Sequence, residues 1–202
     1  MRYPARVELF RQGEPPESVF LLEQGLIKLM RVEAGGTEII VGLRSAGWFL
    51  GAASVILERP YLVSAVTVTD ARVSRIGADA FRDRLRADPK LSWHLHEMHS
   101  REVHSELEHV TEFNSMSARR RLEGFLERLE EMIEPIVNGD PAWLVIPLRQ
   151  WEIAQLIGVT PPYLSELTRE LEEQGVLRRE RECLMLCRQV PVPVPVIRGG
   201  RR

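Results

Sequence analysis

Two short segments of helical periodicity, separated by a tight turn, lie between residues 151 and 177. Apolar side chains recur three or four positions apart in each segment, as they do on the buried face of a helix. These positions are Ile153, Ala154 and Ile157 in the first segment and Leu164, Leu167 and Leu171 in the second. Both segments are therefore predicted to be amphipathic helices.

The residues between these segments favour a helix stop followed at once by a helix start. Gly158 can adopt a positive φ and end the first helix. Thr160 is a common type of N-cap, and Pro161 stands at a position where the missing N–H of proline costs least. Gly175 ends the second helix. Any small helical hairpin could share single features, but together they favour a helix-turn-helix, whose second helix can enter the major groove of DNA.

A strand–turn–strand pattern follows the second helix. Residues 176–177 open a strand, residues 178–182 (RRERE) form a polar turn, and residues 183–187 (CLMLC) return as a strand. A hairpin in this place would be a wing. Its arginines Arg178, Arg179 and Arg181 could contact phosphate.

Short apolar runs separated by glycines predict successive β-strands from about residue 6 to residue 76. The runs cover residues 7–9, 19–22, 26–32, 38–43, 63–69 and 71–76. Gly35 and Gly36, between two of these runs, indicate a hairpin. Many short strands with glycine turns are typical of a β-sandwich or jelly roll. The predicted fold class is α+β: an N-terminal β-roll, a long helix and a C-terminal winged helix-turn-helix.

The long helix, predicted over residues 91–114, is polar apart from a narrow apolar stripe. Leu91, Leu95 and Met98 mark one face, and a second face, slightly slipped in phase, carries Val103, Leu107, Val110 and Phe113. A narrow stripe on a long helix suits a seam between two helices. Packing on the protein's own β-domain and a homodimer contact both remain open. The predicted dimer seam comprises Leu95, Met98, His99, Val103, Val110 and Phe113.

Shorter elements flank these parts. Helices are predicted at residues 79–86 and 119–136, a turn at residues 138–141 and a strand at residues 143–148. Ser117 is the expected N-cap of the 119–136 helix, whose core face carries Leu122, Phe125, Leu126, Leu129 and Ile133. Residues 190–196 alternate valine and proline and are expected to form an extended polyproline segment, followed by a loose basic end at residues 198–202.

Composition narrows the function only slightly. The net charge is −2, so the chain as a whole lacks the basic signature of a nucleic-acid-binding protein, although residues 147–202 hold nine arginines and seven glutamates. No signal-peptide pattern is present, and no apolar run approaches the ~18 residues of a membrane span. We expect a cytoplasmic protein.

Neither the cysteines nor the histidines complete an evident metal site. Cys183 and Cys187, four residues apart in a strand, would lie ~13 Å from each other, too far to form a disulfide, so buried reduced thiols are expected. The histidines are His94, His96, His99, His104 and His109, all on the long helix. A metal or proton sensor at the seam is conceivable, but polar surface positions are the preferred interpretation, and no metal is predicted.

The order of these parts resembles the bacterial cAMP receptor protein / fumarate–nitrate regulator family over nearly the whole chain. The resemblance is carried by FRQGEPPESVFLLEQGLIKL, GWFLGAASVI and IAQLIGVTPPYLSELTRELEEQGVL. It implies a homodimeric transcription regulator whose β-roll senses a signal and whose recognition helices bind a palindromic site on double-stranded DNA. RNA polymerase is a possible further partner.

The effector-binding residues of this family are degenerate here. After Gly51, Ala52 replaces the glutamate that holds the ribose of the nucleotide in cAMP-binding members, and Val63 replaces the arginine of the arginine–serine pair that holds the phosphate. The predicted, degenerate pocket comprises Gly51, Ala52, Ala53, Val63, Ser64, Glu106 and Leu107. These replacements predict no tight cAMP binding. No cofactor is expected either, because the cysteine cluster of iron–sulfur members and the haem ligands of the haem-based member are not matched. The pocket could be filled by the protein's own side chains, or it could take an uncharged or differently shaped ligand.

The resemblance also selects the DNA-contacting residues. They are Thr160, Pro161, Pro162, Tyr163, Ser165, Glu166, Arg169, Arg178 and Arg179. Where family members carry an arginine and a glutamate near the helix start and another arginine one turn later, this chain has Pro161, Pro162 and Glu166. We expect Glu166 to accept from cytosine N4 and Arg169 to reach guanine or phosphate. Residues 119–121, three arginines at the start of a helix, are expected to be solvated rather than to contact phosphate.

We expect four parts: a β-roll sensory domain at 1–89, a dimerisation helix at 90–116, a winged helix-turn-helix at 117–190 and a flexible tail at 191–202. A DNA-binding regulator is the preferred function. The alternative is a β-roll signalling or adaptor protein with a degenerate helix-turn-helix that does not bind DNA. An enzyme is not expected, because the sequence shows no motif-spaced carboxylate pair, no nucleophile elbow and no phosphate loop.

Overall fold

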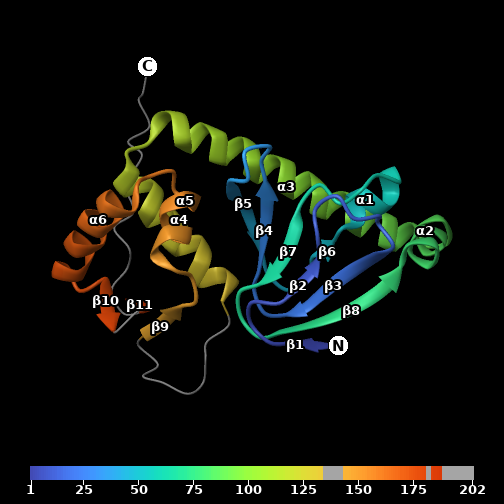
Figure 1. The fold of residues 1–202 in the computed structure, drawn as a ribbon, viewed down its shortest axis with the longest axis horizontal. Helices are drawn as coiled ribbons and strands as arrows, with labels where there is room; N and C mark the ends of the chain where they lie inside the picture. The colour runs from blue at the N-terminus through green and yellow to red at the C-terminus, as the bar shows by residue number, and fades with distance from the viewer. Residues whose placement is uncertain (134–142, 181–182, 188–202) are drawn as a thin grey trace. The chain divides into compact units, whose positions relative to one another are not determined.

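The computed structural model describes residues 1–133, 143–180 and 183–187 (Figure 1). The chain forms two compact units, Met1–Val110 and Thr111–Arg202. The boundary falls inside helix α3 (Pro89–Ser115).

The first unit contains two four-stranded sheets with only antiparallel pairs. One sheet has the order β1 (Arg2–Tyr3), β8 (Ala71–Gly77), β3 (Ser18–Gln24) and β6 (Phe49–Leu50). The other has the order β2 (Glu8–Phe10), β7 (Ser64–Thr67), β4 (Ile27–Val32) and β5 (Glu38–Arg44). Strands β4 and β5 form the predicted hairpin around the glycine pair.

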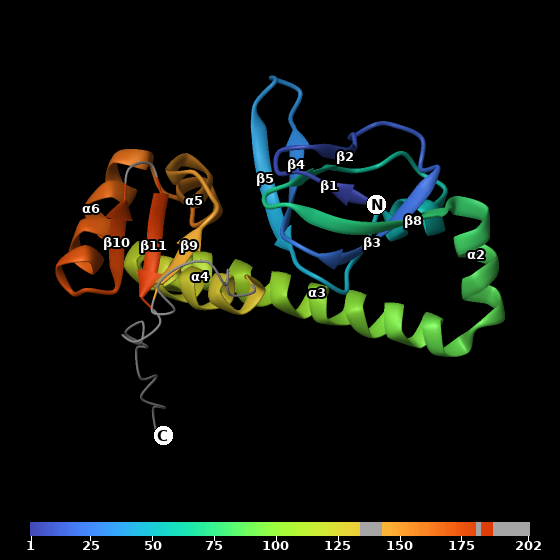
Figure 2. The ribbon, with the colours of Figure 1, turned by 90° about the horizontal axis from the view of Figure 1, so that it is seen from below.

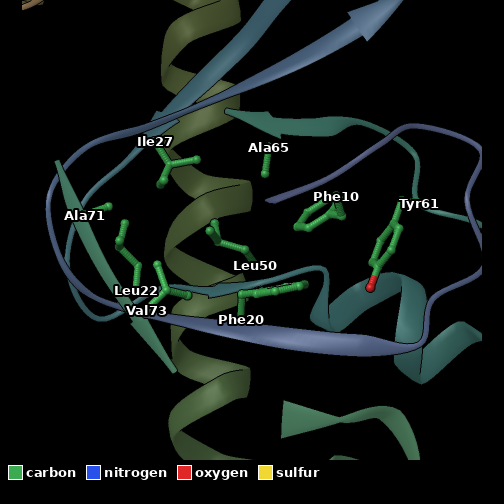
Figure 3. Close-up of a cluster of buried hydrophobic side chains, with 9 residues drawn as sticks. All are labelled: Phe10, Phe20, Leu22, Ile27, Leu50, Tyr61, Ala65, Ala71 and Val73. Carbon is green, nitrogen blue, oxygen red and sulfur yellow. The ribbon is translucent and has the colours of Figure 1, made fainter. Parts of the chain in front are cut away.

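Apolar side chains from both sheets meet in one core (Figure 3). Phe10 stacks on Tyr61 with ring centroids 4.1 Å apart and on Phe20 at 5.6 Å. The Tyr61 hydroxyl donates a hydrogen bond to the Ser18 carbonyl at 2.5 Å, and burial raises the pKa of this hydroxyl. A two-sheet β-roll, as predicted, therefore buries an aromatic cluster whose single polar tip is satisfied.

Three helices complete the first unit: α1 (Ala52–Leu57), α2 (Ala78–Ala87) and the first part of α3. Together with Val19 of β3 they form a second core cluster, whose helical members are Ala52, Val55, Phe81, Leu95 and Met98. Leu95 and Met98 are buried there, against the protein's own β-domain. Their assignment to a dimer seam is therefore wrong, because their apolar surface is already covered within the chain.

The second unit is a helical domain with a small sheet (Figure 2). Its elements are α4 (Ala118–Met132), β9 (Trp143–Ile146), α5 (Gln150–Leu156), α6 (Pro161–Glu173), β10 (Leu177–Glu180) and β11 (Cys183–Cys187). The sheet has the antiparallel order β10-β11-β9. All five predicted core residues of α4 are buried, as are those of α5 and α6. The winged helix-turn-helix is confirmed.

Several local predictions are corrected. Arg178 and Arg179 pair with residues of β11, and strand β10 extends to Glu180. These two arginines therefore lie in the strand and not in the predicted turn. Cys183 is exposed, since it lies at the start of β11 on the face opposite Leu184 and Leu186. The apolar patterns in β1, β6 and α1 are too short for the sequence to predict these elements.

At the helix starts, Thr160 is the N-cap residue of α6 but its side chain makes no capping hydrogen bond, whereas the Ser117 hydroxyl accepts from the Arg120 N–H at 3.4 Å. The predictions for residues 134–142, 181–182 and 188–202 lie outside the described residues. Within the described part of the chain, no helix is long and apolar enough to cross a bilayer.

The α5–α6 turn is fixed by Gly158. Its φ is +65°, and a Cβ at this position would overlap with the ring of Phe113. The Arg121 guanidinium donates to the carbonyls of Ile157 at 2.9 Å and Gly158 at 3.4 Å and lies over the Phe113 ring at 5.0 Å. Arg121 thus satisfies carbonyls left without partners at the end of α5.

Replacing Gly158 with alanine is expected to destabilise the protein by about 2–4 kcal/mol, since a left-handed backbone and a ring overlap must both be relieved. Gly175→Ala is the matched control, because Gly175 also has a positive φ (+73°) but its Cβ would meet nothing within 4 Å. The measurement is the free energy of unfolding from denaturant titrations. Equal losses in the two variants would show that the Phe113 contact is unimportant.

Candidate functional site

A cavity of about 680 Å³ lies in the first unit, beside the aromatic core. Its walls come from β-strand residues such as Phe10 and Leu29, from the β5–β6 region at Arg44 to Leu50, and from the start of α1. Another wall is one face of α3, formed by Met98, His99, Glu102, Val103, Glu106, Leu107 and Val110. The cavity contradicts the hypothesis that side chains of the protein fill the pocket.

Six of the seven predicted pocket residues line this cavity: Gly51, Ala52, Ala53, Val63, Glu106 and Leu107. Ser64 does not. It is buried, and its hydroxyl accepts a hydrogen bond from the Gln12 N–H at 3.0 Å. The Ser64 hydroxyl, which corresponds to the serine of the family's arginine–serine pair, therefore already has a hydrogen-bond partner in the chain that follows β2.

The charge in the cavity wall comes mainly from an ion pair that sequence patterns did not reveal. The Arg44 guanidinium, on β5, pairs with the Glu102 carboxylate, on α3. Arg44 also donates to the Leu43 carbonyl at 2.8 Å and lies 4.6 Å from the centroid of the Trp48 ring. No sequence signal links positions 58 residues apart, although Glu102 stands one helical turn before Glu106 and so shares its face.

The face of α3 that borders the cavity is also apolar and exposed. Val103, Leu107 and Val110 have exposed fractions of 61%, 63% and 58%. His99 is half-buried, and Phe113, beyond the unit boundary, is 38% exposed and contacts Gly158. Of the predicted seam, Val103 and Val110 are exposed, whereas Leu95 and Met98 are buried.

Helix α6 buries its leucines and presents a different set of residues to solvent. Pro161, Pro162, Tyr163, Glu166 and Arg169 are exposed, and Thr160 is exposed just before the helix. The half-buried Ser165 donates its hydroxyl hydrogen to the Pro161 carbonyl at 3.1 Å. Its hydroxyl oxygen can still accept a hydrogen bond.

Arg178 and Arg179, the wing arginines that the described residues include, are held by acidic partners within the domain. Arg178 lies 3.5 Å from the Glu180 carboxylate and stacks on the Trp143 ring at 4.5 Å. Arg179 lies 3.3 Å from the Glu172 carboxylate and donates to the Thr168 hydroxyl at 3.2 Å. Among the described residues, Arg169 makes no such contact. The predicted DNA-contacting surface therefore carries less free positive charge than its arginine content suggests.

Two of the three arginines that open α4 are structural, so the prediction that all three are solvated is wrong. Arg119 pairs with Glu123 at 2.9 Å and with Glu170 at 2.6 Å, and these hydrogen bonds raise its pKa. Arg121 holds the end of α5 as described above. These contacts tie α4 to the helix-turn-helix and fix the orientation of α6 within the domain.

The histidines of α3 do not gather. His104 lies 3.3 Å from Glu108, and His96 faces the Trp93 ring at 5.9 Å. The described residues contain no group of three or more His, Cys, Asp or Glu side chains placed to hold a metal ion.

Comparison with known proteins places two families along the chain. Residues 1–88 match the family described as Cyclic nucleotide-binding domain, and residues 120–189 match the Crp-like helix-turn-helix domain. The cAMP-activated global transcriptional regulator CRP of Pasteurella multocida is 24% identical over 87% of this chain and 84% of its own length. The cyclic AMP receptor protein of Thermus thermophilus is also 24% identical, over 87% of this chain and 78% of its own length.

Solved structures share the fold. The c-di-GMP responsive global regulator CLP of Xanthomonas campestris matches with a TM-score of 0.74 at 19% identity, over 93% of this chain and 92% of that one. FixK2 of Bradyrhizobium japonicum matches with a TM-score of 0.77 at 18% identity, over 93% and 91%. With both domain families in this order and relatives along most of its length, the chain belongs to the cAMP receptor protein / fumarate–nitrate regulator family of helix-turn-helix transcription regulators.

Proposed function

We propose that the protein is a cytoplasmic, homodimeric regulator that binds a palindromic DNA site through α6, with RNA polymerase as a further partner, and that cAMP does not control it. The observation that carries this proposal is the division of α6 into two faces. Leu164, Leu167 and Leu171 are buried, while Tyr163, Glu166 and Arg169 are exposed on the other side. A helix whose apolar face packs against its own domain can enter a major groove with its exposed polar side chains toward the bases.

The proposed roles of the exposed residues follow from their chemistry. Glu166 can accept a hydrogen bond from cytosine N4, and Arg169, which has no acidic partner among the described residues, can reach guanine or phosphate. Thr160, Tyr163 and Ser165 are proposed phosphate contacts, with Pro161 and Pro162 in apolar contact beside them. Arg178 and Arg179 would have to exchange Glu180 and Glu172 for phosphate.

A β-roll adaptor that does not bind DNA is the second candidate. It is favoured by one observation: Glu180, Glu172 and Glu170 partly neutralise the arginines at 178, 179 and 119. Weak phosphate binding would give low affinity for DNA of any sequence. A gel shift with the DNA upstream of the protein's own gene distinguishes the two candidates, because only the regulator should retard it.

The role of Glu166 can be tested by selecting sites from random DNA with the wild-type protein and with Glu166→Ala. We expect the variant to lose its preference at one base pair in each half-site, where a good contact contributes ~1–3 kcal/mol of discrimination. Glu173→Ala, an exposed glutamate at the far end of α6, serves as the control and should leave the preference unchanged. Identical preferences for wild type and Glu166→Ala would exclude this contact.

The proposed dimer uses the exposed apolar face of α3 that also borders the cavity. Val103, Leu107 and Val110 form an apolar strip of helical spacing, which a second copy of the helix could cover. A two-fold protein would present two recognition helices to a two-fold DNA site. In such a dimer both copies of α6 would contact the DNA, so the number of contacts would be twice that of one copy.

Val110→Glu should shift the mass in solution from dimer to monomer, since each copy would place a carboxylate in an apolar seam. Multi-angle light scattering on a sizing column measures this. Val32→Glu is the control, because Val32 is a valine of the β-roll with 43% exposure and lies outside α3. A monomeric wild type, or a Val110→Glu protein of unchanged mass, would contradict the proposed seam.

The proposed independence from cAMP is supported by the cavity wall. No arginine stands at position 63, the Ser64 hydroxyl is engaged with Gln12, and Arg44 is paired with Glu102. A buried phosphate without a cationic partner is poorly compensated. The missing charge-assisted contact is worth ~2–5 kcal/mol.

A calorimetric titration with cAMP at physiological salt should therefore show no binding at micromolar concentrations. The control is a relative that is activated by cAMP, titrated under the same conditions. Micromolar or tighter binding to this protein would contradict the proposal. That result would not contradict DNA binding by α6, because cAMP binding and DNA binding are measured in separate experiments.

A further inference from the structure

The cavity has an unusual combination of an apolar wall and a paired cation. Most of its lining is aliphatic or aromatic, with Trp48, Phe49 and Tyr61 among the rings. Its volume of about 680 Å³ falls in the range of small-molecule sites. A ligand that fills such a cavity gains mainly from burying apolar surface.

Among the described residues that line the cavity, Arg44 is the only arginine or lysine, and its guanidinium has three neighbours. Glu102 pairs with one edge, the Leu43 carbonyl accepts from another nitrogen, and the Trp48 ring lies beneath the group. Only 11% of the Arg44 side chain is exposed. An incoming carboxylate or phosphate would have to displace Glu102 and leave that carboxylate facing the new anion.

Glu106 adds a second carboxylate on the same side. It follows Glu102 by one helical turn, so both lie on the face of α3 that lines the cavity. Glu106 is exposed, and among the described residues its carboxylate has no ion-pair or hydrogen-bond partner. With Arg44 neutralised by Glu102, the charge that an approaching ligand meets is negative. The remaining titratable groups of the lining are His99 on α3 and Tyr61, and burial raises the pKa of the Tyr61 hydroxyl.

We propose that the cavity binds a flat apolar organic molecule with an amine or cationic end directed to Glu106, and that Glu102 excludes anions by holding Arg44. This inference rests on the proposed function, because it names the ligand class and the specificity-determining residue of the same regulator's sensory domain. It does not depend on DNA binding. Glu102 is thus a specificity residue that acts through Arg44.

The test uses the full-length protein and three probes with one ring system and different charge: 1-naphthylmethylamine, 1-naphthylmethanol and 1-naphthylacetate. Dissociation constants are measured by calorimetry at pH 7.5. For the wild type we expect the amine to bind tightest, the alcohol next and the acetate weakest. An interaction between a partly exposed carboxylate and a unit charge corresponds to a difference of about five- to tenfold between amine and acetate.

Three substitutions separate the roles of the two carboxylates. Glu102→Gln frees Arg44 and should tighten acetate binding about tenfold, the effect of one restored charge pair. The double variant Arg44→Gln/Glu102→Gln should lose that gain. Glu106→Gln should remove the preference for the amine. Glu97→Gln, an exposed glutamate of α3 outside the lining, should change none of the three constants.

Thermal unfolding of each variant tests whether the protein still folds. If one single substitution destabilises the unit, acetate binding by the double variant still tests the role of Arg44. The proposal is overturned if the acetate binds the wild type as well as the amine does. It is also overturned if Glu102→Gln changes all three constants equally, or if no probe binds the wild type at millimolar concentration. A failure to bind DNA alongside the expected probe order would reject the regulator and leave the cavity's specificity intact.

Discussion

The arrangement of the DNA-facing helix depends on the junction between α5 and α6. Gly158 permits the turn, the Phe113 ring occupies the space that any other side chain would need, and Arg121 binds the last carbonyls of α5. Behind this junction the leucines of α6 pack into the domain core, so the helix has one fixed face and one free face. Arg119 adds a tie from α4 to Glu170. The exposed side chains of α6 are therefore held by a rigid support, as recognition demands.

Electrostatics restrain both proposed binding surfaces in the same way. In the wing, Glu172 and Glu180 hold Arg179 and Arg178, and in the β-roll Glu102 holds Arg44. A cation that already has a carboxylate partner offers a new anion only an exchange, whose net gain is small. The proposed DNA site must therefore rely more on shape and on Arg169, and an anion in the cavity would gain mainly from apolar contact.

Much of the fold could be predicted from the sequence because its signals are local. The helix-turn-helix was evident from a glycine, a proline and leucines at fixed spacing, and the β-roll from short runs separated by glycines. Burial of Leu95 and Met98 against the β-domain could not be distinguished from a dimer contact, since both give the same stripe. The Arg44–Glu102 and Arg121–Ile157 contacts join distant positions, and composition gives no indication of such pairs. Ser64 was identified as a pocket residue, but its engagement by the Gln12 N–H is a backbone contact that no motif records.

The central claim is that the free face of α6 meets DNA. Photo-cross-linking tests it most directly, with benzoylphenylalanine placed at position 163 and, as the comparison, at position 93, where Trp93 is an aromatic residue with 64% exposure in the other unit. With duplex DNA selected by the wild-type protein, the account predicts a covalent DNA adduct from position 163 and none from position 93. Adducts from both positions in equal amount, or none from position 163 while the DNA remains bound, would contradict it.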